Sequence, residues 1–206
     1  ATVRILDNEN NTAPTVEAAQ ADGEEDSVSP IEITLTGSDN DPYDKVTSFT
    51  LSSLPENGVL YANAAMTTLA VVGQAYQAGE NESLTFFFAP NENWNGETTF
   101  DYKGSDGELE SKETVATVTV TGTNDAPVAV ADTLDAVEDT PVTYTAAQLV
   151  GNDTDVDNGN SDLAISSVTS GSNGEAVLNA DGTVTFTPNA NYNGEADFTY
   201  IVNDGT

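Results

Sequence analysis

The chain has 206 residues, which suit one large or two ordinary domains, and it contains neither cysteine nor histidine. Disulfide bridges, thiolate metal sites, cysteine nucleophiles and histidine general bases are therefore excluded. With 35 Asp and Glu residues against 4 Lys and Arg, the formal net charge is -31, so we expect neither a nucleic-acid partner nor direct contact with a membrane.

Residues 1–6 largely alternate between apolar and polar side chains, as a β-strand does, and they resemble residues 116–121. Each of these segments precedes an Asn-x-Ala-Pro tetrapeptide, at residues 11–14 and at residues 124–127. A tetrapeptide that recurs after similar strands indicates tandem modules. Residues 1–6 are therefore predicted to be the last strand of a preceding module.

The repeat extends well beyond the tetrapeptide. An acidic pair, an acidic loop and an Asn-aromatic-Asn-Gly loop recur in the same order. The spacing between the copies shrinks after the acidic loop, so the first module is predicted to carry an insertion around residues 63–81. The matching segments are residues 25–26 with 138–139, 37–41 with 151–155, and 88–96 with 186–194.

The apolar residues are mainly β-branched or aromatic and fall in alternating runs, which disordered acidic chains lack. We therefore predict two folded β-sandwich modules. The second stops at residue 206, whereas the first continues to residue 121, so the second is expected to lack its final strand. The predicted organisation is a preceding strand (1–7), a linker (8–13), the first module (14–122), a linker (123–127) and the second module (128–206).

Short strand signals recur between turn residues, and no segment shows a helical period. Residues 148–151 are expected to form at most a single turn. Seven or eight short strands per module predict an all-β, immunoglobulin-like sandwich. The predicted strands are 15–18, 31–36, 46–51, 59–61, 69–72, 83–88, 98–103 and 114–121 in the first module, and 128–131, 142–145, 163–169, 176–178, 184–187 and 196–202 in the second.

Aromatic residues on the predicted strands are expected to form the cores, because alternate side chains of a strand share one face. Phe100 and Tyr102 in the first module correspond to Phe198 and Tyr200 in the second. Trp94 stands in an Asn-Trp-Asn-Gly loop just before a strand, where an aromatic ring can close the end of a sandwich. The alternative interpretation of Trp94 is a stacking platform for a sugar.

The topology of the sandwich predicts at which end of a module each acidic side chain lies. The linker enters beside the loop after the second strand and the loop between the last two strands, while the loop after the first strand lies at the far end. Two junctions are therefore expected to gather oxygen ligands. The candidates are Glu25, Asp26, Asn124, Asp125, Asp153, Asp155, Asp157 and Asp204 at the junction between the modules, and Asp7, Asn11, Asp39, Asp41 and Asp106, with Asp44 nearby, at the junction before the first module.

These oxygen ligands predict a calcium site. Calcium takes about six to eight oxygen ligands, whereas transition metals favour the imidazole and thiolate groups that this chain lacks. The Asp-x-Asp-x-Asp run at residues 153–157 superficially matches an EF-hand loop, but Asn158 stands where the glycine should be and Ala164 where the bidentate glutamate should be. A merely solvated acidic surface, as in salt-adapted proteins, is the alternative explanation of the charge.

The same motifs resemble the cadherin-like tandem repeats of giant bacterial surface adhesins of the RTX type. The similarity covers nearly all of the second module and the linker, Glu-Asp, Asp-x-Asp and Asn-x-Asn-Gly features of the first. It implies a secreted rod-like extender at the bacterial cell surface, stiffened by Ca2+ between neighbouring repeats, that holds a ligand-binding tip away from the cell in adhesion or biofilm formation. The positions that match the calcium ligands of cadherins are Glu25, Asn124, Asp125, Asp153 and Asp155.

Two rival functions are weighed against the spacer. A peptide- or carbohydrate-binding module would use the insertion and Trp94 of the first module, the surface that the repeat does not share. An enzyme would need a cleft or a nucleophile motif that the sequence does not show, so we predict no catalysis. The partners expected are neighbouring repeats in a monomeric rod, with a strand swap in which residues 1–6 complete the open sheet of the second module of another molecule.

Overall fold

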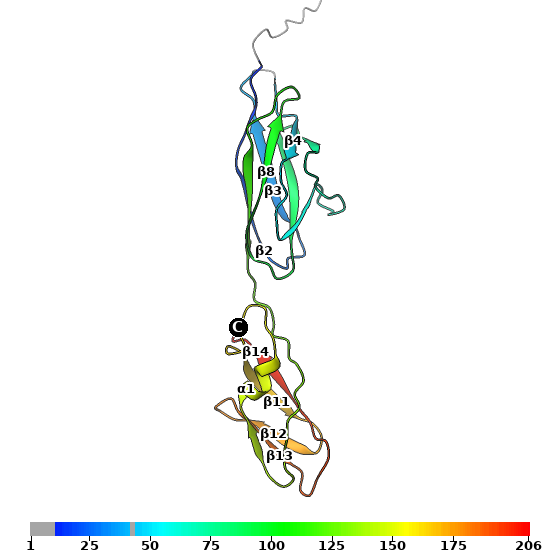
Figure 1. The fold of residues 1–206 in the computed structure, drawn as a ribbon, viewed down its shortest axis with the longest axis vertical. Helices are drawn as coiled ribbons and strands as arrows, with labels where there is room; N and C mark the ends of the chain where they lie inside the picture. Colours follow the sequence, from blue (N-terminus) through cyan, green and yellow to red (C-terminus); the bar gives the residue numbers. More distant parts are fainter. Residues whose placement is uncertain (1–10, 42–43) are drawn as a thin grey trace, which may run out of the picture. The chain divides into compact units, whose positions relative to one another are not determined.

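The computed structural model describes residues 11–41 and 44–206. The strand expected at residues 1–6 and the candidate ligand Asp7 lie outside the described residues. The chain divides into two compact units, Ala1–Thr123 and Asn124–Thr206, which we call module one and module two. Both are β-sandwiches (Figure 1). No helix in the described ranges is long and apolar enough to cross a membrane.

Module one consists of two facing sheets (Figure 1). All strand pairs are antiparallel except the pair of β2 and β9, which runs parallel. The four-stranded sheet has the order β1 (Thr15–Val16), β3 (Ile31–Ser38), β7 (Ser83–Pro90) and β5 (Gly58–Tyr61), and the five-stranded sheet has the order β2 (Ala19–Glu24), β9 (Thr114–Thr121), β8 (Gly96–Ser105), β4 (Ser48–Leu51) and β6 (Ala75–Gln77).

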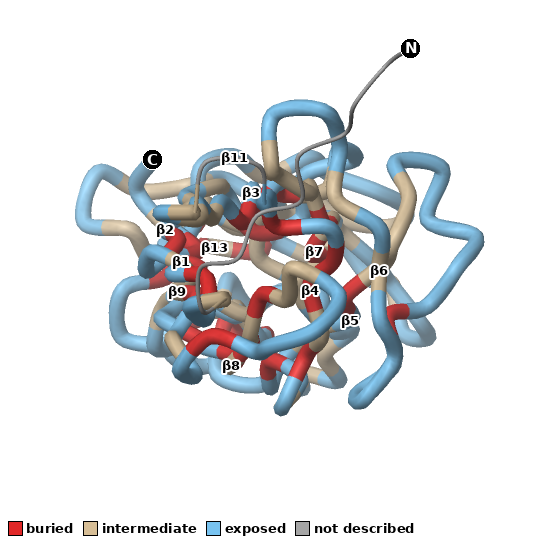
Figure 2. The backbone as a smooth tube through the Cα atoms, turned by 90° about the horizontal axis from the view of Figure 1, so that it is seen from above, coloured by how far each residue is buried: buried red, intermediate tan, exposed pale blue. Residues whose placement is uncertain are grey.

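The core of module one follows from the alternation of buried and less buried side chains along its longer strands. On β3 the residues alternate between buried and exposed, and on β9 Ala116 and Val118 are completely buried. Aromatic side chains fill the space between the sheets, since Phe86 and Phe100 lie edge to face with ring centroids 6.5 Å apart. Figure 2 shows the buried positions along the strands and the exposed loops around them.

Module two has a smaller pair of sheets. One has the order β10 (Val142–Tyr144), β13 (Val184–Pro188) and β12 (Gly174–Leu178), and the other pairs β11 (Ala164–Ser170) with β14 (Phe198–Asn203). The predicted single turn is a short helix, α1 (Ala146–Leu149), continued by a 3-10 turn at Val150–Asn152. A capping box between Thr145 and Gln148 starts the helix, and Leu149 anchors it in the core.

Three strand predictions differ from the structure. Strand β2 was not predicted, because its sequence contains Ala, Gln, Asp and Gly and shows no β-branched residue. The strand predicted at residues 69–72 is wrong: only Leu69 forms an isolated bridge, and the strand of the insertion is β6. At residues 128–131 only Val128 pairs, in an isolated bridge with Thr154.

The two modules share one plan with one difference. Strands β3, β7 and β5 of module one correspond to β10, β13 and β12, and β4 and β8 correspond to β11 and β14. Strand β2 pairs in its sheet only with β9. In module two, residues 129–136, which follow the tetrapeptide as β1 and β2 do in module one, carry no strand, and no described residue occupies the place of β9.

Candidate functional site

The loops of module one that surround residues 11 and 12 form a cluster of polar side chains, which we call cluster one: Asn11, Thr12, Asp39, Asp41 and Asp106. The side-chain amide of Asn11 donates to Asp106 Oδ2 at 3.2 Å, and the main-chain N–H of Thr12 donates to Asp41 Oδ2 at 2.7 Å. The main-chain N–H of Asp41 in turn donates to Asp39 Oδ1 at 2.9 Å. The structure therefore brings together the candidate ligands predicted at this end of module one that lie in its described part.

Module two carries the same arrangement in cluster two: Asn124, Asp125, Asp155, Asp157 and Asp204. The amide of Asn124 donates to Asp204 Oδ2 at 2.6 Å, and the N–H of Asp125 donates to Asp157 Oδ2 at 2.7 Å. The N–H of Asp157 donates to Asp155 Oδ1 at 2.8 Å. The three hydrogen bonds named for cluster one thus have counterparts, although the two modules differ in most of their residues.

These hydrogen bonds correct the alignment of the acidic loops. The sequence comparison matched Asp39 with Asp153, but the structure matches Asp39 with Asp155, two residues later. The strand pairing agrees, because Ser38 pairs with Thr15 as Thr154 pairs with Val128. The 3-10 turn that precedes Asp153 in module two accounts for the displacement.

Asp153 lies in the core of module two instead of in cluster two. Its side chain is completely buried, and Oδ1 accepts the N–H of Val130 at 2.7 Å. The hydroxyl of Tyr200 lies 3.2 Å from both oxygens of Asp153, 2.9 Å from the Leu149 carbonyl oxygen and 3.1 Å from Asp132 Oδ2, and these acceptors share its one proton. Burial raises the pKa of the Tyr200 hydroxyl, and the carboxyl groups of Asp132 and Asp153 raise it further. Because Asp153 is completely buried and its Oδ1 accepts the Val130 N–H, its role is to hold the fold, and we leave it out of the calcium ligands proposed below.

Three side-chain oxygens in the clusters are buried without a hydrogen-bond donor: Asn11 Oδ1, Asp39 Oδ2 and Asp155 Oδ2. Asp39 and Asp155 are counterparts, so the same atom lacks a donor in both modules. A buried polar oxygen without a partner is costly, and a bound cation satisfies it. In the described ranges no three carboxylates are grouped so as to hold an ion; an ion would therefore also need amide, main-chain or water oxygens, which calcium accepts.

Electrostatic repulsion is concentrated at cluster one. Desolvation raises the pKa of Asp44, and the nearby carboxylates Asp39, Asp41, Asp106 and Glu108 raise it further. Desolvation also raises the pKa of Asp106, but hydrogen bonds from the Leu109 and Glu108 N–H groups and from Asn11 outweigh it and lower the pKa overall. Glu108, which also accepts from Asn11 at 3.4 Å, was not predicted as a member of this group; its position directly after the repeated Asp-Gly pair was the available signal.

Replacing Asp44 with Asn is expected to raise the melting temperature of module one by about 1 °C in a chelator, because one of five mutually repelling carboxylates is removed. Fluorescence of Trp94, the only tryptophan of the chain, reports the unfolding of this module. The matched control is Asp22→Asn on the exposed face of β2, which removes the same charge away from the cluster. A lower melting temperature for Asp44→Asn than for the control would contradict the repulsion.

The acidic pair at residues 25–26 lies at the other end of module one, beside its last residues. Glu25 is 2% exposed, and its Oε1 accepts the N–H of Thr123 at 2.9 Å. Asp26 Oδ1 accepts the N–H of Asn93 at 3.0 Å, and Asp139 does the same for Asn191 at 2.7 Å. The second acid of each pair therefore holds the Asn-x-Asn-Gly loop in place, and Glu25 holds both Asn95 of that loop and Thr123, the first residue of the linker.

Trp94 is partly buried and packs against the core of module one. A Cβ atom placed on Gly96 would lie 3.2 Å from its ring, so the glycine, whose φ is +138°, makes room for the tryptophan. Gly194 has the same φ beside Tyr192. Packing against the core therefore explains why a tryptophan stands in this loop, without a sugar ligand.

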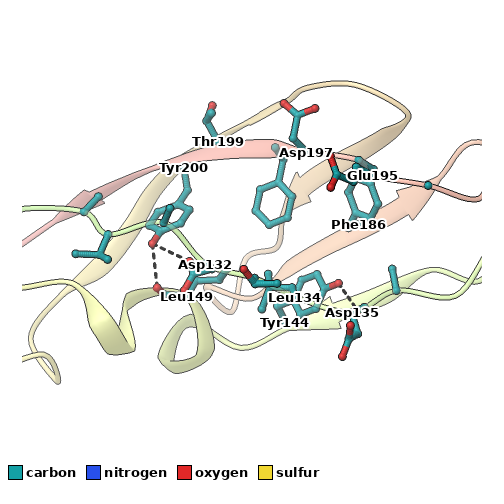
Figure 3. Close-up of a pocket in the computed structure, with 18 residues that line it drawn as sticks. Asp132, Leu134, Asp135, Tyr144, Leu149, Phe186, Glu195, Asp197, Thr199 and Tyr200 are labelled. Carbon is teal, nitrogen blue, oxygen red and sulfur yellow. Dashed lines mark hydrogen bonds between the residues drawn. The ribbon is translucent and has the colours of Figure 1, made fainter.

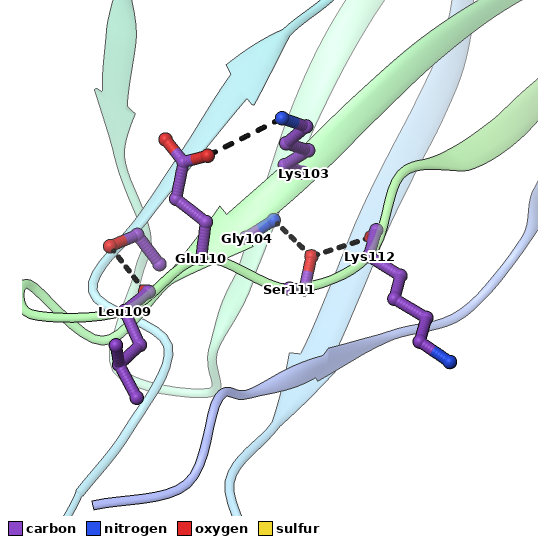
Figure 4. A network of polar contacts seen from close by, with 7 residues as sticks. Lys103, Gly104, Leu109, Glu110, Ser111 and Lys112 are labelled. Carbon is purple, nitrogen blue, oxygen red and sulfur yellow. Dashed lines mark hydrogen bonds and ion pairs between the residues drawn. The ribbon is translucent and has the colours of Figure 1, made fainter.

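Positive charge is scarce around all of these groups. In the described part of the chain the one ion pair joins Lys103 to Glu110 at 3.4 Å on the surface of module one (Figure 4). Lys112, two residues further on, is exposed. Neither cluster contains a lysine or arginine to offset its carboxylates.

In comparisons with known proteins, the two modules match different family models. A family model described as "Cadherin-like domain" matches residues 123–206, and one described as "Bacterial Ig domain" matches residues 11–121. No curated protein matches the chain. The resemblance to cadherin-like repeats is thus confirmed for module two, whereas module one matches the bacterial Ig family.

Two solved structures are similar to the chain. The solution structure of a conjugate transposon protein from Bacteroides vulgatus is 13% identical, with a TM-score of 0.36 over 57% of this chain and 92% of the other. A protocadherin gammaB7 structure of domains EC3-6 is 11% identical, with a TM-score of 0.44 over 93% of this chain and 47% of the other. The chain thus spans about half the length of the protocadherin chain.

Only Ig and cadherin-like domains, which are not catalytic, are matched, and such domains are typical of surface proteins. The family model of the bacterial Ig domain covers more than half of the 206 residues. The chain therefore belongs to the bacterial Ig domain family, and its Ig domain is followed by a cadherin-like domain.

Proposed function

We propose that the chain is part of a calcium-dependent spacer of a secreted bacterial surface adhesin, in which each module lengthens the protein and bound Ca2+ stiffens the linkers. Repeated modules suit a spacer because each adds length without new chemistry. The observation that carries the proposal is the donorless oxygen at the same position of both clusters, Asp39 Oδ2 and Asp155 Oδ2.

The clusters couple the ion to the linkers. Asn11 and Thr12 in cluster one, and Asn124 and Asp125 in cluster two, belong to the tetrapeptides that precede each sandwich. Without the ion the carboxylates repel one another and only neutral hydrogen-bond donors oppose the repulsion. When Ca2+ binds, carboxylate and amide oxygens of the cluster coordinate the same ion, so the tetrapeptide becomes fixed to its module. The free energy of binding then adds to the free energy of unfolding of that module.

The test is thermal unfolding of the 206-residue chain in a chelator, in Ca2+ and in sodium chloride of matched ionic strength. We expect Ca2+ to raise both transitions, by the equivalent of about 2.7 kcal/mol when free Ca2+ is 100 times its Kd. Sodium chloride screens repulsion but cannot satisfy the donorless oxygens, so it should give a smaller increase. Equal effects of the two salts would support the merely solvated acidic surface and reject the calcium site.

Single substitutions locate the ions. Asp39→Asn should remove most of the calcium-dependent increment of module one, and Asp155→Asn that of module two, with little change in the chelator. Glu32→Gln on β3 and Glu175→Gln on β12 remove one exposed charge from the same modules and should keep the increment. An increment that survives both aspartate substitutions, or falls equally in the controls, would place the ions elsewhere.

The stiffness of the linker between the modules is measured separately from stability. Because the chain contains no cysteine, one spin label can be placed in each module through an introduced cysteine. The distribution of label-to-label distances should be broad in the chelator and narrow in Ca2+. A rise in melting temperature without narrowing would retain the calcium sites and reject the spacer mechanism.

A further inference from the structure

The segment of module one between Glu56 and Glu80 carries no charge. It is the longest stretch of the chain without a charged residue, although 19% of all residues are charged. It contains β5, the insertion and β6. Exposed apolar side chains on such a segment indicate a contact surface. The large apolar side chains exposed here are Val59, Met66, Leu69, Val71 and Val72.

A row of side chains continues this surface across the outer face of the four-stranded sheet. Tyr61 on β5 pairs with Phe87 on β7 and, through an isolated bridge, with Leu69 of the insertion. Residues that pair across neighbouring strands present their side chains on the same face. This face points away from the core, because Leu60 and Phe86, the sequence neighbours of Tyr61 and Phe87, are buried in it.

We call this surface the side patch. Leu69 is 59% exposed at one end of the row, and Tyr61 and Phe87 are half-buried beside it. The next residues of the insertion extend the patch toward β6, since the N–H of Val71 donates to the hydroxyl of Tyr76 on that strand at 2.7 Å. The side patch consists of Val59, Tyr61, Leu69, Val71, Val72 and Phe87.

The sandwich does not require these side chains in order to fold. In module two Thr185 stands at the position of Phe87, because it pairs with β10 and β12 as Phe87 pairs with β3 and β5. The hydroxyls of Thr143 and Thr185 lie 3.0 Å apart on this face, and module two has no insertion. The same architecture therefore forms with polar side chains at this position, so core packing does not explain the aromatic row of module one.

The position of the side patch indicates which neighbour can reach it. The chain enters module one beside cluster one and leaves it beside Glu25, which accepts the N–H of Thr123 at the other end. The insertion, drawn in blue-green in Figure 1, projects from the side of the module between these ends. We therefore expect the partner of the side patch to be a molecule that lies alongside module one, since the linkers attach at its ends.

Charge favours a second copy of the chain as that partner. With a formal net charge of -31, two copies repel each other wherever their carboxylates meet, and the side patch lets them touch without opposing charges. A basic partner would instead be drawn to the acidic clusters. The composition agrees, because interface cores are depleted of charge and enriched in aromatic side chains.

We propose that the side patch of module one binds the side patch of a second copy of the chain, in a two-fold symmetric contact that buries Leu69 and Tyr61. One loop and a few strand residues make a small interface, so the contact is weak and forms where copies are crowded. It goes beyond the calcium-dependent spacer, because it joins chains side by side and needs no ion.

Sedimentation of the 206-residue chain in chelator tests the contact. We expect a monomer–dimer equilibrium that sodium chloride strengthens, because salt screens the repulsion between two acidic chains. Leu69→Asp should weaken association by about tenfold or more, because it places a charge in an apolar contact. Val28→Asp is the matched control: it adds the same charge at a side chain that is 96% exposed between β2 and β3, and it should leave association unchanged.

The fold of both variants is checked by Trp94 fluorescence, and both replaced side chains are exposed, so module one should unfold as in the wild type. Thiol protection then locates the contact, because the chain has no cysteine of its own. The rate of alkylation of Val71→Cys should fall as the chain concentration rises, whereas that of Val28→Cys should stay constant.

Three results would overturn the proposal. The first is a wild-type chain that stays monomeric at its highest soluble concentration, in low and in high salt. The second is equal association of Leu69→Asp and Val28→Asp, which would place the contact on another surface. The third is an alkylation rate of Val71→Cys that does not depend on concentration while the chain dimerises.

Discussion

Replacing Asp153 with alanine is expected to lower the free energy of unfolding of module two by about 3 kcal/mol, in chelator and in calcium alike. The carboxyl group is completely buried and is the acceptor for the Val130 N–H and the Tyr200 hydroxyl. Removing it leaves a void in the core and leaves the buried Val130 N–H without its acceptor, at about 1–3 kcal/mol for an unsatisfied buried group. The Tyr200 hydroxyl keeps the Leu149 carbonyl oxygen and Asp132 as acceptors. The effect should be independent of calcium because the carboxyl group is completely buried inside the fold, away from cluster two.

Asp155→Ala is the matched control, two residues away in the same loop. One oxygen of Asp155 accepts local N–H groups from the loop, and the other has no donor. Its replacement should cost little in chelator and should remove the calcium-dependent increment. Calorimetry of both variants with and without calcium separates the two roles. A calcium-dependent loss for Asp153→Ala would return this residue to the set of candidate ligands.

Phe100→Ala is expected to destabilise module one by about 3–5 kcal/mol, and Phe198→Ala to destabilise module two by roughly half as much. Phe100 is 1% exposed and contacts Phe86 and Tyr102. Phe198 stacks on Tyr144 and Phe186 but is only partly buried, because it also lines an open cavity between residues 129–136 and β14 (Figure 3). Less buried surface is therefore lost with it.

Trp94 fluorescence follows module one, and calorimetry follows both transitions. Equal costs for the two phenylalanines in dilute solution would contradict the difference in burial.

The sequence predicted the parts of the fold that local patterns specify. Alternation of β-branched and aromatic residues located β9 to the residue, and it located β3, β7 and β8 to within two residues at each end. It missed β2, whose residues have little strand preference and which forms because β9 offers it a parallel partner. It also assigned a strand to residues 69–72, where the side chains are apolar but mostly exposed in the insertion.

The candidate clusters were predictable only in part. The repeat and the sandwich topology were enough to group Asn11 with Asp106 and Asn124 with Asp204. Burial of Asp153 was not predictable, because an aspartate in an acidic loop gives no sign that the chain turns inward there. The short helix and the 3-10 turn displace the acidic loop of module two by two residues relative to that of module one. In the structure, Asp155 and Asp157 therefore take the places of Asp39 and Asp41.

The parallel pair of β2 and β9 also determines when module one can close. Thr121 on β9 donates a hydrogen bond to Gly23 on β2 across 98 positions of the chain. During synthesis from the N-terminus, β2 therefore has no partner in its sheet until β9, near the end of the module, has been made. Contacts between residues far apart in the sequence form slowly. We therefore expect this module to fold as one unit, with the pairing of β9 and β2 as a late step.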